Sequence, residues 1–198
     1  FRSPAPSTMK HRQTGFTLVE LMITVALLGI LLAAAAPNFD SALNSSRLAG
    51  VANELTGAVN VARAEAIRRN QRVALCRSAD GASCSADGNW SGWMVFVDAD
   101  SNCARADTEE VLKTGSVDAP VVVRESAAIS ALSGCIAFRP DGIARGTDGA
   151  ALLAGSLAAC IPTTRPAENV RAVAIAFGGR TTLRRQNGGG ACDVPSDT

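Results

Sequence analysis

The sequence predicts an α+β fold in which a long N-terminal helix packs on an antiparallel β-sheet domain. Three observations predict it. Residues 16–36 form an apolar run that only two threonines, one glutamate and one glycine interrupt. The segment that follows is amphipathic at helical spacing. Beyond Asn70 the chain breaks into short β-prone runs separated by turn residues.

The composition narrows the classes of function. The 198 residues carry 19 Lys and Arg against 18 Asp and Glu, a formal net charge of +1. Near-neutrality excludes nucleic-acid binding by bulk charge and leaves only a local basic patch open. His11 is the one histidine and precedes the apolar run, so its removal would exclude Ser-His, Cys-His and His-metal chemistry. We therefore expect a protein that is not an enzyme and holds no cofactor.

The run from Phe16 to Ala36 is predicted to be a transmembrane helix. About 20 apolar residues cross a bilayer as a helix. Ahead of the run, Lys10, His11 and Arg12 form a positive flank of the kind that stays cytoplasmic. No second run of comparable length follows, so the rest of the chain is expected on one side of the membrane, outside the cytoplasm.

A secretory signal peptide is the rival interpretation, with cleavage near the alanines at 33–36. Glu20 discriminates between the two. A carboxylate inside a membrane segment costs about 3 kcal/mol and marks a specific role. A signal peptide has no use for that charge, so a retained anchor is favoured.

The apolar run opens with the string Gly15-Phe16-Thr17-Leu18-Val19-Glu20-Leu21-Met22. This string resembles the processing site of type IV pilins and type II secretion pseudopilins. The resemblance implies that a prepilin peptidase cuts after Gly15 and methylates Phe16. Residues 1–15 are then a leader peptide, with Met9 favoured as the true start. Pro37 lies where the N-terminal helices of this family often bend.

The same resemblance implies a role for Glu20 in assembly. The methylated amine of Phe16 stays cationic and would pair with the Glu20 carboxylate of a neighbouring subunit in a filament. Such a pair offsets a desolvation cost that neither buried charge could bear alone. The alternative is that Glu20 merely reaches the face of the membrane.

Residues 37–70 are predicted to form the amphipathic half of the same helix, bent near Pro37. Small and apolar residues recur there at helical spacing, while charged residues occupy the other faces. The repeating positions are Leu48, Val51, Leu55, Ala58, Ala62 and Ala66. We expect this stripe to pack on the globular domain.

Residues 71–198 are predicted to form that domain, β-rich and periplasmic. Turn pairs such as Asp-Gly and Gly-Gly separate its β-prone runs. The predicted strands are Arg72–Arg77, Trp93–Asp98, Val121–Arg124, Cys135–Phe138, Val170–Phe177 and Thr181–Arg185.

The order of motifs in the domain resembles one branch of pilin-like proteins in particular. Residues 62–70, 89–98 and 135–142 carry the resemblance. The branch is GspH/FimT/FimU, which comprises pseudopilin H of type II secretion and minor pilins of type IV pili. It implies a subunit that works by packing into a filament.

Six cysteines follow the apolar run: Cys76, Cys84, Cys103, Cys135, Cys160 and Cys192. An even number in an extracytoplasmic domain predicts disulfides, and the absence of any Cys-x-x-Cys argues against zinc or thioredoxin-type chemistry. Fifteen complete pairings are open. Proximity favours Cys76–Cys84, and Cys160–Cys192 would fasten the glycine-rich C-terminal tail.

An acidic segment imitates a calcium loop. Asp98, Asp100 and Asn102 alternate, and Glu109 stands twelfth from Asp98. The sixth position of such a loop should be glycine for a sharp turn, but it is Cys103. A solvated acidic turn is therefore favoured over a calcium site, and we predict no metal.

Two tryptophans, Trp90 and Trp93, flank Gly92. Exposed tryptophans anchor partners in many interfaces. Packing between sheet and helix is favoured here, above all for Trp93.

Four arginines gather near the C-terminus: Arg171, Arg180, Arg184 and Arg185. On a strand, Arg180 and Arg184 share one face with Thr182, where guanidinium groups could contact phosphates. FimT-like minor pilins have been linked to DNA capture through a C-terminal Gly-Arg-x-Arg stretch. Here Arg184 comes two places later than that pattern requires, which preserves the strand face but departs from the motif. A solvated arginine strand is the alternative.

These observations together predict a minor pilin of a type IV pilus in a Gram-negative bacterium. It would be anchored in the inner membrane and then enter the filament, near its tip, beside other pilins. Pseudopilin H of a type II secretion system is the main alternative, in which case the filament is a pseudopilus. A DNA-binding receptor overlaps with the first interpretation. A membrane-anchored enzyme lacks any convincing constellation.

Overall fold

The computed structural model describes residues 15–85, 89–146 and 151–197, apart from the side chains of residues 34–38. The predicted leader, with Met9 and the positive flank of Lys10, His11 and Arg12, thus lies outside the described residues except for Gly15. The chain divides into two units, residues 1–39 and 40–198, and each is described by itself.

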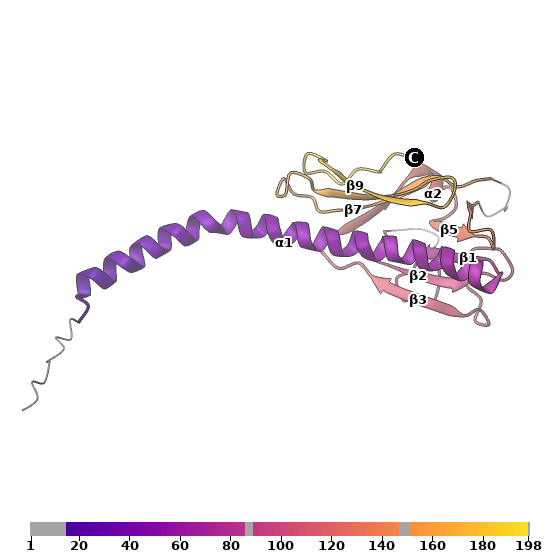
Figure 1. Ribbon diagram of the computed structural model, residues 1–198, viewed down its shortest axis with the longest axis horizontal. Helices are drawn as coiled ribbons and strands as arrows, with labels where there is room; N and C mark the ends of the chain where they lie inside the picture. The colour runs from indigo at the N-terminus through magenta and orange to yellow at the C-terminus, as the bar shows by residue number, and fades with distance from the viewer. Residues whose placement is uncertain (1–14, 86–88, 147–150, 198) are drawn as a thin grey trace, which may run out of the picture. The chain divides into compact units, whose positions relative to one another are not determined.

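One long helix and nine strands dominate the described chain (Figure 1). The elements are α1 (Leu18–Arg69), β1 (Val73–Arg77), β2 (Gly92–Val97), β3 (Val111–Ser116), β4 (Val122–Glu125), α2 (Ala127–Ser130), β5 (Cys135–Phe138), β6 (Ala144–Arg145), β7 (Gly155–Cys160), β8 (Val170–Ile175) and β9 (Thr181–Gln186).

The long helix predicted from Phe16 to Asn70 is confirmed as α1, which begins two residues later and ends one residue earlier. Its backbone stays helical through Pro37, whose side chain is not among those described, and the bend there remains a prediction. No helix within the described residues is both long enough and apolar enough to cross a membrane.

The second unit places the strands in two antiparallel sheets that flank the later turns of α1 (Figure 1). The first sheet has the order β3-β2-β1-β5-β6 and the second has the order β4-β7-β8-β9. The registers pair Leu75 with Val95 and Ile136, and Leu157 with Val173. These aligned apolar residues lie on the inner faces of the two sheets, which face the helix.

The main core lies between α1 and these inner faces. The helix stripe predicted from the sequence is confirmed, since Leu48, Leu55 and Ala62 have no exposed surface. Trp93 and Val95 from β2 join the same cluster. Trp90 and Trp93 are each only 2% exposed, so the prediction that they pack in the core holds for both.

The outer faces of the sheets are covered as well, which the sequence did not indicate. β1, β2, β5, β7 and β8 are buried at every position rather than at every second one. Ala74, Met94 and Phe96 form a second cluster on the outer face of the first sheet, and Ala158 and Ala172 contribute to a third on the second sheet. A strand buried on both faces needs a second layer over it.

Disulfides fasten that second layer. Cys76–Cys84 holds the β1–β2 loop, Cys103–Cys135 holds the β2–β3 loop, and Cys160–Cys192 holds the C-terminal tail. The two pairings favoured from the sequence are confirmed. The third joins cysteines 32 residues apart, and its partners meet only because β5 lies beside β1.

All six predicted strands are present, but β3, the two-residue β6 and β7 were missed. β3 reads Val-Leu-Lys-Thr-Gly-Ser and is half exposed at the edge of its sheet, so it lacks a clean alternation. β7 reads Gly-Ser-Leu-Ala-Ala-Cys, without a β-branched or aromatic residue. Burial on both faces, rather than intrinsic propensity, makes β7 a strand.

A buried ion pair joins the two sheets. Arg77 at the end of β1 donates from Nη1 to Oε1 of Glu125 at the end of β4, at 2.7 Å. Trp90 donates from Nε1 to the other carboxylate oxygen at 2.6 Å. The Arg77 guanidinium also donates from Nε to the carbonyl of Ser85 at 2.8 Å. Both charged side chains are at most 10% exposed, so each depends on the other to remain buried.

We expect Glu125→Ala to lower the free energy of unfolding by about 3–5 kcal/mol, because it leaves the Arg77 guanidinium buried without its counter-charge. Denaturant unfolding of the full chain, followed by tryptophan fluorescence, measures this. The matched control is Glu110→Ala, which removes an exposed partner of Arg69 and should cost about 0–1 kcal/mol. Equal, small losses for both variants would contradict the buried-pair account.

Candidate functional site: the start of the long helix and an arginine face

The start of α1 has a built helix cap. Thr17 stands just before the helix, and its hydroxyl accepts a hydrogen bond from the backbone N–H of Glu20 at 3.2 Å. Thr-Leu-Val-Glu matches the capping box, in which a glutamate three residues after the cap can reach back. The observed bond uses the backbone N–H of Glu20, so it does not by itself explain why a carboxylate stands at this position.

Apart from Glu20 and Thr24, the described side chains of residues 18–33 are apolar, and they occupy every face of the helix. Leu18, Met22 and Ile30 are each at least 65% exposed, and Phe16 is 81% exposed. Glu20 is the one charged residue between positions 16 and 39. An exposed apolar surface of this extent is typical of segments that contact lipid or partner helices.

Arg180, Thr182 and Arg184 share one face of the chain around β9, as predicted, and both arginines are exposed. They line a concavity of about 400 Å³ whose floor includes Ala174 and Ala176. The register places Thr182 opposite Ala174 across β8 and β9. These small side chains leave room for a ligand between the guanidinium groups.

Arg63 of α1 is a third arginine at this concavity, and the sequence analysis missed it. Its Nη1 donates to the carbonyl of Gly179 at 3.4 Å. A Cβ on Gly179, whose φ is +69°, would also meet the carbonyl of Gly142 at 2.6 Å. Arg63 and Gly179 are 116 residues apart in sequence, so no local pattern could have linked them.

Arg171 does not belong to this exposed set, which corrects the sequence-based expectation. It is 3% exposed, and its Nη1 donates to the carbonyls of Glu168 and Val170. Burial, and then the nearby charge of Arg185, lower the pKa of its guanidinium. Arg185 pairs with Arg171 in register and so lies on the face of β9 opposite Arg184.

The acidic turn is not the solvated loop that we favoured from the sequence. Asp98 is fully buried and Glu109 is 7% exposed, although Asp100 is exposed. Burial raises the pKa of the Asp98 carboxyl, while the ion pair with Arg72 at 2.8 Å opposes that rise. The sequence analysis did not foresee this burial because it did not consider Arg72, which stands just before β1 and supplies the counter-charge to Asp98.

The carboxylates of this turn also hold its backbone. Asp98 accepts the N–H of Asn102 at 3.0 Å, and Glu109 accepts the N–H groups of Ala99 and Ala106 at 2.8 and 2.9 Å. Ligand atoms of Asp98, Asp100 and Glu109 lie within 4.8 Å of one another. These bonds account for the grouping of the three acids, and the calcium alternative remains a hypothesis.

Comparison with known proteins identifies the family of this chain. A family model described as Type II transport protein GspH matches residues 51–187, well over half of the chain. The chain belongs to the GspH family. A second model, the prokaryotic N-terminal methylation motif, matches residues 10–36, which include Gly15, Phe16 and Glu20. This GspH-family protein is thus a type IV pilin-like protein, as the motifs indicated.

Curated relatives are similar over part of the chain. The pilin-like protein PilA1 of Thermus thermophilus is 39% identical over 90 residues, which are 44% of this chain and 50% of that protein. The type IV major fimbrial protein FimA of Dichelobacter nodosus is 46% identical over 54 residues, 27% of this chain and 34% of that protein. The chain therefore spans half or less of the length of these relatives.

Two solved structures are similar to the chain. The type IV minor pilin FimU of Pseudomonas aeruginosa is 19% identical, with a TM-score of 0.50, over 71% of this chain and 90% of that one. The minor pseudopilin EpsH of Vibrio cholerae is 12% identical, with a TM-score of 0.46, over 72% and 98%. At 19% identity the likeness to FimU concerns the fold alone.

Proposed function

We propose that this GspH-family protein is a minor pilin of a type IV pilus. Its precursor is cut after Gly15 by a prepilin peptidase, and Phe16 is then methylated. Residues 16–36 anchor the chain in the inner membrane, with the globular domain in the periplasm, until the subunit enters the filament near its tip. The observation that carries the proposal is Glu20, the lone charge on an exposed apolar helix, five residues after the glycine.

The physical step is the transfer of an apolar helix from lipid to a bundle of neighbouring helices. The apolar side chains lose little in that exchange, because both environments exclude water. A carboxylate in either environment is costly unless a cation meets it. The amine of Phe16 in an adjacent subunit supplies that cation, so the pair sets the axial register between subunits.

The alternative is a minor pseudopilin of a type II secretion system, which would assemble by the same helix. The family model that matches the chain is described as a type II transport protein, whereas FimU, whose fold is similar, is a type IV minor pilin, so the comparisons favour neither role. Deleting the gene separates them. Loss of surface pili with normal protein secretion supports the pilin proposal, and loss of secretion with normal pili overturns it.

We expect Glu20→Gln to abolish recovery of the protein in sheared filaments, because the amide keeps the capping geometry but removes the charge that pairs with the Phe16 amine. The variant should remain in the membrane fraction. Immunoblots of the sheared and membrane fractions from the native bacterium measure both.

Thr17→Val is the matched control, since it removes the hydroxyl that caps α1 and leaves the charge of Glu20 intact. It should enter filaments nearly as well as the unaltered protein. The opposite ranking, with Glu20→Gln recovered normally and Thr17→Val lost, would make Glu20 a capping residue and overturn the charge-pairing account.

DNA capture is a second candidate function, and the grouping of Arg63, Arg180 and Arg184 around one concavity favours it. One guanidinium group can bind a phosphate through two parallel N–H···O hydrogen bonds. No acid lies between positions 169 and 192, so no carboxylate of that segment competes with a phosphate. The contacts would be to the backbone of DNA and would not depend on its sequence.

With three phosphate contacts, we expect affinity for duplex DNA to fall about 40-fold for a fourfold rise in salt. Arg180→Gln with Arg184→Gln should remove most of the binding and of this salt dependence without unfolding the domain, because both side chains are exposed. Fluorescence anisotropy with the full chain in detergent and an arbitrary labelled duplex measures both.

The control is Arg124→Gln with Arg165→Gln, which changes the net charge equally at two exposed arginines outside the concavity. It should retain binding. Equal losses in the two double variants would reduce the effect to net charge, and no binding at low salt would leave filament assembly as the sole function.

A further inference from the structure

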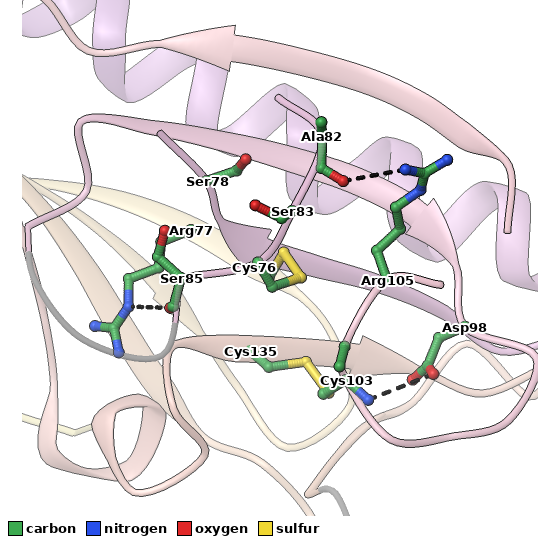
Figure 2. Close-up of a disulfide and its surroundings, with 12 residues drawn as sticks. Cys76, Arg77, Ser78, Ala82, Ser83, Ser85, Asp98, Cys103, Arg105 and Cys135 are labelled. Atoms are coloured by element: carbon green, nitrogen blue, oxygen red, sulfur yellow. Dashed lines mark hydrogen bonds between the residues drawn. A yellow bond between two sulfur atoms is a disulfide. The ribbon is translucent and has the colours of Figure 1, made fainter. Parts of the chain in front are cut away.

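Two disulfides lie side by side on the outer face of the first sheet (Figure 2). Cys76 of β1 stands directly opposite Cys135 of β5 in the register. The next pair, Arg77 and Gly134, is hydrogen-bonded, since the Arg77 N–H donates to the Gly134 carbonyl. Cys76 and Cys135 are therefore a non-hydrogen-bonded pair, whose Cα atoms approach to about 4.5 Å in such ladders. That spacing falls within the range that a disulfide can bridge.

Each of these two cysteines is bonded instead to a different loop. Cys76 joins Cys84 with a Cα–Cα distance of 5.7 Å, and Cys135 joins Cys103 with a distance of 6.2 Å. Cys84 and Cys103 both line one concavity of about 240 Å³, together with Ser133. The four sulfurs thus have two geometrically related pairings: strand to loop, as observed, or strand to strand and loop to loop.

The two loop cysteines, Cys84 and Cys103, are more accessible to solvent than the two strand cysteines, because they line the concavity. Cys76 and Cys135 are 1% and 2% exposed, whereas Cys84 and Cys103 are half-buried. A nucleophile that enters from solvent therefore reaches Cys84 or Cys103 first. Attack on Cys84 directs the departing electron pair to Cys76, next to the neighbouring disulfide.

Arg72 contacts the second disulfide, Cys103–Cys135, at the sulfur of Cys103. Its Nη2 donates a hydrogen bond to Cys103 Sγ at 3.6 Å, while its Nε faces the Asp98 carboxylate at 2.8 Å. A guanidinium beside a sulfur stabilises negative charge that develops there. Cys103 is thus the favoured leaving group when Cys135 is attacked.

We propose that this cluster of four cysteines is a thiol-reactive relay site whose substrate is a small thiol. The thiolate attacks Cys84 Sγ, forms a mixed disulfide and expels Cys76 as a thiolate. Cys76 then attacks Cys135 Sγ, forming the strand-to-strand bond and expelling Cys103 as a thiolate. Cys103 finally attacks the mixed disulfide at Cys84, forming the loop-to-loop bond and releasing the small thiolate. Two disulfides exist before and after, so no oxidant or reductant is consumed.

The exchange changes what holds the outer layer in place. Before it, each loop is covalently fastened to a strand above the cluster of Ala74, Met94 and Phe96. After it, the loops are bonded covalently only to each other and remain on the sheet through hydrogen bonds, such as that from Arg77 Nε of β1 to the Ser85 carbonyl at 2.8 Å (Figure 2). A small thiol would therefore loosen this face of the domain without removing a disulfide.

Tryptic mapping distinguishes the two pairings without ambiguity. Cleavage after arginine yields peptides 73–77, with Cys76, 78–105, with Cys84 and Cys103, and 125–145, with Cys135, because the Arg139–Pro140 bond resists trypsin. The observed pairing links all three peptides. The relayed pairing links 73–77 to 125–145 and leaves 78–105 with an internal disulfide.

The test incubates the folded full chain in detergent with substoichiometric reduced glutathione, blocks thiols with an alkylating agent and maps the peptides. We expect the two-peptide species to appear, while the Cys160–Cys192 link on the other sheet stays intact. Persistence of the three-peptide species alone, or a glutathione-bonded Cys84 beside free Cys76 and an intact Cys103–Cys135 bond, overturns the proposal.

Two variants separate the relay from general disulfide scrambling. Ala104→Leu fills the concavity at an exposed position and should slow formation of the two-peptide species more than tenfold, whereas Ala106→Leu, exposed but outside the concavity, should not. Cys103→Ser with Cys135→Ser should stop the reaction at the glutathione-bonded Cys84. Equal rates in the two alanine variants would show that the thiol does not enter by this route and would overturn the site.

Discussion

The small side chains along residues 48–66 of α1 are the constraint on which the domain depends. Ala52, Ala58, Ala62 and Ala66 have no exposed surface, and both sheets pack against them. An alanine stripe leaves space between helix and sheets that large side chains such as Trp93 and Phe138 fill from the sheet side. The close packing extends into the sheet, where a Cβ on Gly115 would overlap the Trp93 ring.

Because α1 covers only the inner faces of the sheets, loops and the C-terminal tail cover the outer faces. Disulfides hold these segments in place. Short loops rarely bury enough apolar surface to stay ordered without help. Each outer layer here is tied to the strand beneath it by a disulfide, and buried pairs such as Arg72 with Asp98 neutralise the charges that the layer encloses. The disulfide exchange that we propose is possible because two of these disulfides start from facing residues of adjacent strands, Cys76 and Cys135.

The sequence predicted α1, six of the strands, two disulfides and the burial of Trp93, because periodicity, turn residues and proximity along the chain are local signals. It failed where distant residues decide the outcome. β7 is a strand only because both its faces are covered, Asp98 is buried only because Arg72 meets it, and Arg171 is buried beside Ser45 of α1. The alignment of Arg63 with Arg180 likewise depends on packing between helix and sheet, for which no spacing rule exists.

The central claim is that Phe16 becomes the methylated first residue of a subunit whose apolar helix is retained for assembly. N-terminal sequencing and intact-mass measurement of the protein extracted from membranes of the native bacterium test it most directly. The account predicts a chain that begins at N-methylated Phe16 and still contains Glu20. A chain that begins near Pro37 would mean that the apolar run is a discarded signal peptide, and it would contradict the role of the helix in a filament.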